Sequence, residues 1–182
     1  MTRILAVLLA GTLLLMAGCA AKQLPPPQWT YEREAIRLHI KADNKLNLDD
    51  DEAHTLLLCI YQLSDPNNFN QLANDEEGLY QLLECSLFGD GAAAAKRMII
   101  QPGQDINLAL DRAEGARYVA IVAGYYILEK ERMVKMAEIP EFVEKKGFIK
   151  KSKTRKPAPL NVDLLLGPQQ ITTLSTSTPK GK

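Results

Sequence analysis

The first residues whose types and spacing suggest chemistry stand at the N-terminus, where an apolar run stops at a cysteine. Arg3 gives this end a positive charge, and the residues from there to Ala17 are almost wholly apolar. The run is shorter than the about 20 apolar residues of a transmembrane helix, and its length is typical of a secretory signal. Ala17 and Gly18 are small, as a peptidase acting on an extended segment requires just before its cut. The pattern predicts a signal peptide over residues 1–18.

Cys19 follows the small residues directly, which resembles the lipobox of bacterial lipoproteins. In a lipobox, the thiol receives a diacylglycerol, the signal is cleaved, and the new N-terminus is acylated. Met16 is a mild departure, because this pattern usually has Leu there. One acyl chain anchors a protein only marginally, at about 0.8 kcal/mol per buried methylene, so stable attachment needs several. The resemblance implies lipidation at Cys19, and Ala20 favours the outer membrane, since Asp would be expected for retention in the inner one. An ordinary signal peptide with an incidental cysteine is the alternative.

Two further cysteines, Cys59 and Cys85, would remain in the mature chain. In an oxidising periplasm such a pair predicts a disulfide, and two buried free thiols are the alternative. A Cys–His nucleophile with His54 is disfavoured, because the apolar segment around Cys59 indicates a buried strand. A zinc site is also disfavoured, because only His39 and His54 could add ligands and no CxxC or HxxxH spacing exists. There is no GxSxG stretch, so we expect no enzyme, no metal and no cofactor.

Charged residues form one acidic and one basic run. The acidic run, Asp49–Glu52, lacks the glycine and the spaced ligands of a calcium loop, so it predicts a solvated turn. The basic run, Lys145–Lys156, could contact anionic lipid or an acidic partner, with a mobile solvated loop as the alternative. Without residues 1–18 the chain has 21 basic and 22 acidic residues, a net charge of −1. This balance gives no global electrostatic case for nucleic-acid binding.

The elements that must position these residues follow from hydrophobic periodicity. Residues 35–42 alternate strictly, with Ile36, Leu38 and Ile40 on one face, which predicts a half-buried strand with His39 toward solvent. A polar loop over residues 43–53 separates it from a strand over 54–63 that is apolar on both faces. A helical insertion follows at about 66–86. Further strands lie within 95–111, 116–128, 133–140 and 160–167, which gives six to eight strands in total. A basic loop over 144–159 precedes the last of them.

Many short strands with turn signals predict a mainly β protein, a β-sandwich with a short helical insertion. The expected organisation is a lipidated N-terminus with a Pro-rich tether over 19–34, a sandwich over 35–167 and a disordered tail over 168–182. The tether contains three consecutive prolines, which favour an extended conformation that holds the domain off a membrane.

Several stretches in order resemble one family, the type VI secretion outer-membrane lipoproteins called TssJ or VasD. They are the lipobox-like start, then "LLLCIYQL", "DPNNFNQL", "LYQLLEC", "IQPGQ" and "ARYVAIVAGYY". The resemblance covers roughly residues 35–140, and the order of the motifs carries more weight than any one of them. It implies a transthyretin-like β-sandwich and a structural role in a trans-envelope membrane complex. A periplasmic ligand-binding lipoprotein is the alternative, and an envelope hydrolase comes third.

The resemblance also implies a partner, the periplasmic C-terminal region of the inner-membrane component TssM. Family members contact it through the loop between the first two strands of the sandwich, which by strand order is Asp43–Ala53 here. Leu46 and Leu48 are the only large apolar side chains of this loop, and we expect them to be exposed anchors, with packing onto the edge of the sandwich as the alternative. The residues expected to bind the partner are Asn44, Lys45, Leu46, Asn47, Leu48, Asp49, Asp50 and Asp51.

Overall fold

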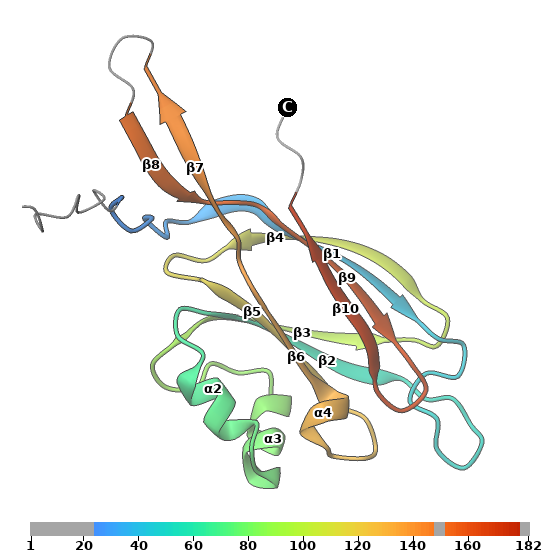
Figure 1. Cartoon of the computed structure of the whole chain (residues 1–182). Coiled ribbons are helices and arrows are strands. Elements are labelled where there is room, and N and C mark those ends of the chain that lie inside the picture. Colours follow the sequence, from blue (N-terminus) through green and yellow to red (C-terminus); the bar gives the residue numbers. More distant parts are fainter. Residues whose placement is uncertain (1–23, 148–151, 179–182) are drawn as a thin grey trace, which may run out of the picture.

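Two four-stranded sheets face each other in the computed structural model, which describes residues 24–147 and 152–178 (Figure 1). One sheet has the strand order β10-β9-β1-β4 and the other β3-β2-β5-β6. Neighbouring strands are antiparallel except for β1 and β9, which run parallel. The predicted β-sandwich is therefore confirmed. Its strands are β1 (Glu32–Ala42), β2 (Leu56–Leu63), β3 (Ala92–Ile100), β4 (Asp105–Arg112), β5 (Tyr118–Ala123), β6 (Val134–Glu138), β9 (Leu160–Leu166) and β10 (Ile171–Ser177).

The first sheet covers the core with one face only. Alternate residues of β1 and of its parallel neighbour β9 are buried, whereas Arg37 and Asp163 between them are exposed. A strand with one solvated face must alternate in this way, because successive side chains point to opposite faces of the sheet. The buried members are Ile36, Leu38, Ile40, Leu160, Val162, Leu164 and Leu166.

In the second sheet, β2 is covered on both faces, which explains why it is apolar almost throughout. Its outer face lies against two short helices, α2 (Asn67–Leu72) and α3 (Glu76–Leu83). The Tyr61 hydroxyl donates a 2.6 Å hydrogen bond to the carbonyl of Leu82, and the ring packs against Phe69 and Phe88. The predicted disulfide joins Cys59 of β2 to Cys85 just after α3, with the Cα atoms 5.1 Å apart. The bond therefore links the helical insertion to the sheet.

Two segments expected to lack structure are strands instead. The basic stretch, expected to be a loop, forms most of a hairpin of β7 (Glu141–Lys146) and β8 (Ser152–Pro157) that projects from the sandwich (Figure 1). The tail, expected to be disordered over 168–182, contributes β10, which pairs with β9 along its length. Both predictions were wrong because most of these side chains are exposed. Backbone hydrogen bonds hold such strands, and the sequence then shows no alternation of apolar and polar residues.

The N-terminal segment is also more ordered than a free tether. Trp29 packs against the core, its carbonyl accepts a 2.6 Å hydrogen bond from the Gly115 amide, and β1 begins at Glu32 rather than at residue 35. A last short helix, α4 (Lys130–Met133), leads into β6. Across the described residues, no helix has the length and apolar character needed to cross a membrane. The same part of the chain contains no cluster of three or more potential metal ligands.

Candidate interaction surface at the end of β1

The loop between β1 and β2 is held against its neighbours by backbone hydrogen bonds. The Asp43 amide donates to the Leu166 carbonyl at 2.8 Å, and the Leu48 amide donates to the Pro168 carbonyl at 2.7 Å. These bonds tie both halves of the loop to the turn between β9 and β10. The loop is therefore a defined surface at one end of the sandwich rather than a free segment.

The tip of the loop is acidic and tightly turned. Asp49 and Glu52 exchange two backbone hydrogen bonds of 3.0 and 2.8 Å. Asp50 and Asp51 between them have φ angles of 47° and 62°, as the central residues of a type I′ turn do. Aspartate tolerates this left-handed region better than most side chains. All four acidic side chains are exposed, so the turn presents a compact negative charge to solvent.

Leu46 and Asn47 are not available to a partner, which corrects the prediction for this loop. Leu46 is fully buried in the core, so it serves the fold rather than acting as an exposed anchor. Asn47 is 6% exposed and its side chain bridges two segments, donating to the Thr55 carbonyl and accepting from the Tyr126 amide. Leu48 is half-buried. The other predicted residues are exposed, namely Asn44, Lys45, Asp49, Asp50 and Asp51.

An apolar patch beside the loop was missed by the sequence reasoning. Tyr126 is 55% exposed and Ile127 41%, and both line a shallow depression together with Leu48. The Tyr126 ring meets His54 edge to face, at 5.4 Å between centroids. Beneath them, burial raises the pKa of Tyr125, so its hydroxyl stays neutral. The sequence did carry a signal: the apolar run over 116–128 is longer than most strands, and β5 ends at Ala123.

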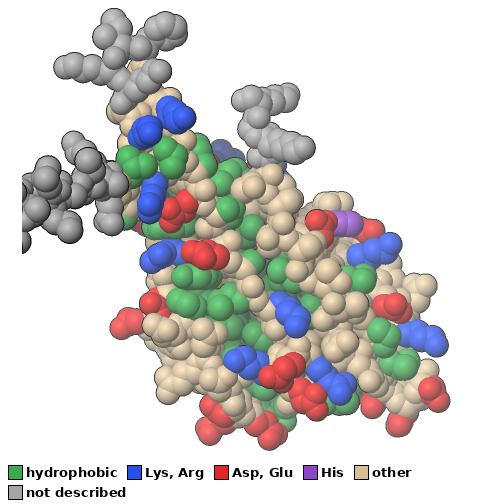
Figure 2. Space-filling model, viewed as in Figure 1, with side chains coloured by type: hydrophobic (Ala, Val, Ile, Leu, Met, Phe, Trp, Pro, Cys, Tyr) green, Lys and Arg blue, Asp and Glu red, His purple; other side chains and the backbone are tan. Residues whose placement is uncertain are grey.

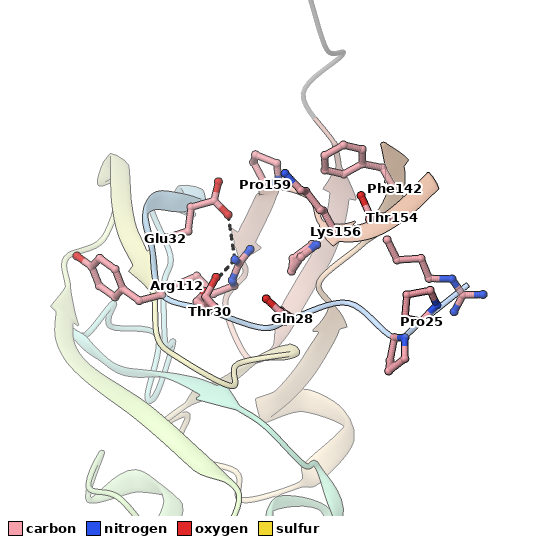
Figure 3. Close-up of a pocket in the computed structure, with 13 residues that line it drawn as sticks. Pro25, Gln28, Thr30, Glu32, Arg112, Phe142, Thr154, Lys156 and Pro159 are labelled. Atoms are coloured by element: carbon pink, nitrogen blue, oxygen red, sulfur yellow. Dashed lines mark hydrogen bonds and ion pairs between the residues drawn. The ribbon is translucent and has the colours of Figure 1, made fainter. Parts of the chain in front are cut away.

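At the opposite end of β1, a buried arginine fastens the N-terminal segment to the sandwich. The Arg112 guanidinium is 2.9 Å from the Glu32 carboxylate and donates a 2.9 Å hydrogen bond to the Thr30 carbonyl (Figure 3). It also lies over the ring of Trp29, 5.9 Å from the centroid. A groove of about 640 Å³ runs past these residues to the β7–β8 hairpin. Cys19 precedes this segment and lies outside the described residues.

A family model matches most of the chain. Residues 34–163 match the family model described as "Type VI secretion lipoprotein, VasD, EvfM, TssJ, VC_A0113". A search of curated proteins finds no match.

Solved structures with the same fold come from type VI secretion systems. The lipoprotein TssJ1 from Pseudomonas aeruginosa is similar with a TM-score of 0.56 and 19% identity, over 86% of this chain and 100% of that chain. Lip from Serratia marcescens, a membrane-bound component of the system, gives a TM-score of 0.55 and 16% identity, over 82% of this chain and 99% of that one. A chain in a structure of the TssM C-terminal domain from EAEC gives a TM-score of 0.51 and 19% identity, over 77% of this chain and 96% of that chain.

Proposed function

Because the chain belongs to the type VI secretion lipoprotein family, we propose that it is the structural outer-membrane lipoprotein of a type VI secretion membrane complex. In this proposal, acylated Cys19 anchors it to the periplasmic face of the outer membrane. The surface at the far end of the sandwich binds the periplasmic C-terminal region of TssM. Its role is to connect a membrane to a partner, without catalysis.

The arrangement of the two ends of β1 carries the proposal. The strand has 11 residues, so it spans about 35 Å at roughly 3.3 Å per residue. The segment that follows Cys19 enters at its start, and the acidic loop leaves from its end (Figure 1). A protein anchored through residue 19 would therefore direct the loop away from its own membrane, toward a partner that is rooted in the opposite one.

The chemistry of the far end suits protein recognition. Its centre is the apolar patch of Leu48, Tyr126 and Ile127, beside the acidic turn of Asp49–Glu52. Exposed aromatic side chains often become the residues that dominate a binding energy, because they bury a large area at low entropic cost. Rim charges mainly set the association rate and its salt dependence. We therefore assign affinity to the patch and electrostatic steering to the acidic turn.

The test is the affinity of the purified chain for the periplasmic C-terminal region of TssM. Tyr126→Ala with Ile127→Ala should weaken binding at least tenfold, since truncation of each anchor costs about 1–2 kcal/mol. Tyr80→Ala with Leu87→Ala is a matched control, because these side chains, on and just after the helical insertion, are 56% and 60% exposed. The control should bind as the unmodified chain does. Equal affinities for the two variants would remove the patch from the proposal.

The anchor is tested separately in cells. Cys19→Ser should prevent acylation and release the protein from the membrane fraction in the absence of its partner. A Cys19→Ser protein that stays firmly in the membrane fraction would contradict the lipoprotein anchor.

A further inference from the structure

The β7–β8 hairpin carries more positive charge than its fold requires. Its described residues include five cations and two acids, Glu141 and Glu144, and nearly all of these side chains are exposed. The hairpin projects from the sandwich, and lysines and arginines are prominent on the surface of the hairpin (Figure 2). The cations are Lys145, Lys146, Lys153, Arg155 and Lys156.

One face of the hairpin partly neutralises its own charge, because one carboxylate lies between two lysines. Phe142 stands opposite Lys156, and Glu144 lies on the same face, since alternate residues share a face and directly paired residues lie side by side. The Glu144 carboxylate is 2.9 Å from the Lys156 ammonium and 3.5 Å from that of Lys146. Phe142, Thr154 and Lys156 of this face line the groove shared with the N-terminal segment, and the neighbouring Arg155 lines it as well (Figure 3).

The other face does not neutralise its charge. Lys145 is directly opposite Lys153, and Arg155 is opposite Val143, which is 46% exposed. Glu141 lies at the base of this face, and among the described residues no ion pair joins it or another acid to these three cations. Like charges directly opposite each other destabilise a sheet. The pairing of two lysines is therefore unfavourable for the hairpin itself, and a negatively charged surface would offset that cost.

The position of the hairpin identifies that surface. Pro25 and Pro26 of the N-terminal segment line the same groove as Phe142 and Lys156 of the hairpin. Five residue steps separate Cys19 from Leu24, the first described residue, and an extended chain covers at most about 18 Å in five steps. A lipid on Cys19 therefore holds Leu24 within about two nanometres of the bilayer surface, and the groove at the base of the hairpin begins at the next residue, Pro25.

We propose that Lys145, Lys153 and Arg155 bind the anionic phospholipid headgroups of the membrane that holds the Cys19 anchor. The placement rests on the proposed lipoprotein function, whereas the charged face stands on the hairpin alone. Each basic side chain near an anionic leaflet strengthens binding by about fivefold, and the attraction decreases with salt. With the lipid as first attachment, this second contact stops the domain from rotating freely about its tether and fixes which end faces the periplasm.

Vesicle binding tests the proposal without the anchor. The chain from Ala20 to Lys182 keeps every strand and every core residue of the part that the structure describes, including Trp29. It should sediment with vesicles of phosphatidylcholine and phosphatidylglycerol at low salt, and not with vesicles of phosphatidylcholine alone. Lys145→Gln, Lys153→Gln and Arg155→Gln together should reduce the affinity by roughly a hundredfold.

A matched control makes the same change in net charge elsewhere. Lys41, Lys96 and Arg97 are exposed, and their replacement by Gln should leave most of the vesicle binding intact. Equal losses in the two triple variants would mean that net charge alone matters and would overturn the proposal. Failure of the unmodified chain to bind would also overturn it and leave an acidic protein as the occupant. Since the chain tested lacks Cys19, neither result bears on the lipid anchor. The membrane fractionation of the Cys19→Ser protein tests that anchor separately.

Discussion

At the residue scale, Leu46 and Leu48 lie two positions apart in one loop and meet opposite environments. Leu46 is fully buried and Leu48 is half-buried beside the apolar patch. Leu46→Ala should lower the free energy of unfolding by about 2–5 kcal/mol, because it leaves a cavity in a close-packed core. Leu48→Ala should cost less than about 1 kcal/mol, as surface truncations generally do. Urea denaturation of both variants measures this difference, and similar losses would contradict the assigned burial.

Glu32 is a second residue whose effect differs from what its exposure suggests. Its side chain is 46% exposed, yet its partner Arg112 is 2% exposed. Glu32→Ala should cost about 3 kcal/mol, because it leaves a buried guanidinium without its counter-charge. Glu138→Ala, which removes an exposed carboxylate from β6, should change stability by less than about 0.5 kcal/mol. Thermal melts of the two variants provide the comparison, and equal melting temperatures would show that Arg112 does not depend on Glu32.

At the scale of the elements, His39 connects three strands of the first sheet. Its Nε2 atom is 2.9 Å from the Asp105 carboxylate on β4, and its Nδ1 atom is 3.2 Å from that of Asp163 on β9. The hydrogen bond to Asp105, with that to Asp163 second, raises the pKa of His39 above its ordinary value of 6.5. A raised folded-state pKa stabilises the fold fully below pH 6.5, and this contribution is lost as the pH rises through the folded-state pKa.

The His39 bridge predicts a pH-dependent difference. The melting temperature of the unmodified chain should exceed that of His39→Gln most clearly below pH 6.5 and approach it at higher pH. Asp105→Asn should remove more of this dependence than Asp163→Asn, since Asp105 is the larger cause of the shift. A difference that is constant across this range would rule out the charged bridge.

The disulfide acts between elements too, because it closes 26 residues that include both helices of the insertion. Its loss in Cys59→Ala with Cys85→Ala should lower the free energy of unfolding by about 3–4 kcal/mol in the chain-entropy model. Reduction of the unmodified protein is the control, because it opens the bond without changing a side chain. Denaturation of the oxidised protein, the reduced protein and the double variant should give similar free energies of unfolding for the last two. A reduced protein as stable as the oxidised one would contradict this prediction.

The elements that could be predicted from sequence are those with one buried face. The alternation of Ile36, Leu38 and Ile40 directly reports the core below β1, and the continuous apolar run of β2 reports its two covered faces. The β7–β8 hairpin gives no such signal, because Phe142 and Val143 are themselves exposed. The burial of Leu46 could not be inferred locally either, because it depends on strands that are distant in sequence. The apolar patch could not be predicted for the same reason, since only the fold brings Ile127 beside Leu48.

At the scale of the whole molecule, the proposed contacts assign a direction to the sandwich. In acylated protein on vesicles that contain phosphatidylglycerol, a cysteine introduced by Val143→Cys should react severalfold more slowly with a water-soluble maleimide than in detergent. One introduced by Asp50→Cys, at the other end, should react at the same rate in both. The reason is that headgroups cover the hairpin while the acidic turn points into solution. Equal protection of both sites would contradict the orientation.

The parallel pairing of β1 with β9 has a consequence for how the chain is exported. His39 and Asp163, which are paired across this junction, are 124 residues apart in the sequence. A chain that crosses a membrane N-terminus first delivers β1 long before β9. The apolar face of β1 must then wait beside an open sheet edge, and such long-range pairings form slowly and expose strands to aggregation. In the export that the proposed lipoprotein anchor requires, β1 therefore lacks its neighbour β9 until nearly the whole chain has crossed, so completion of this sheet depends on completion of export.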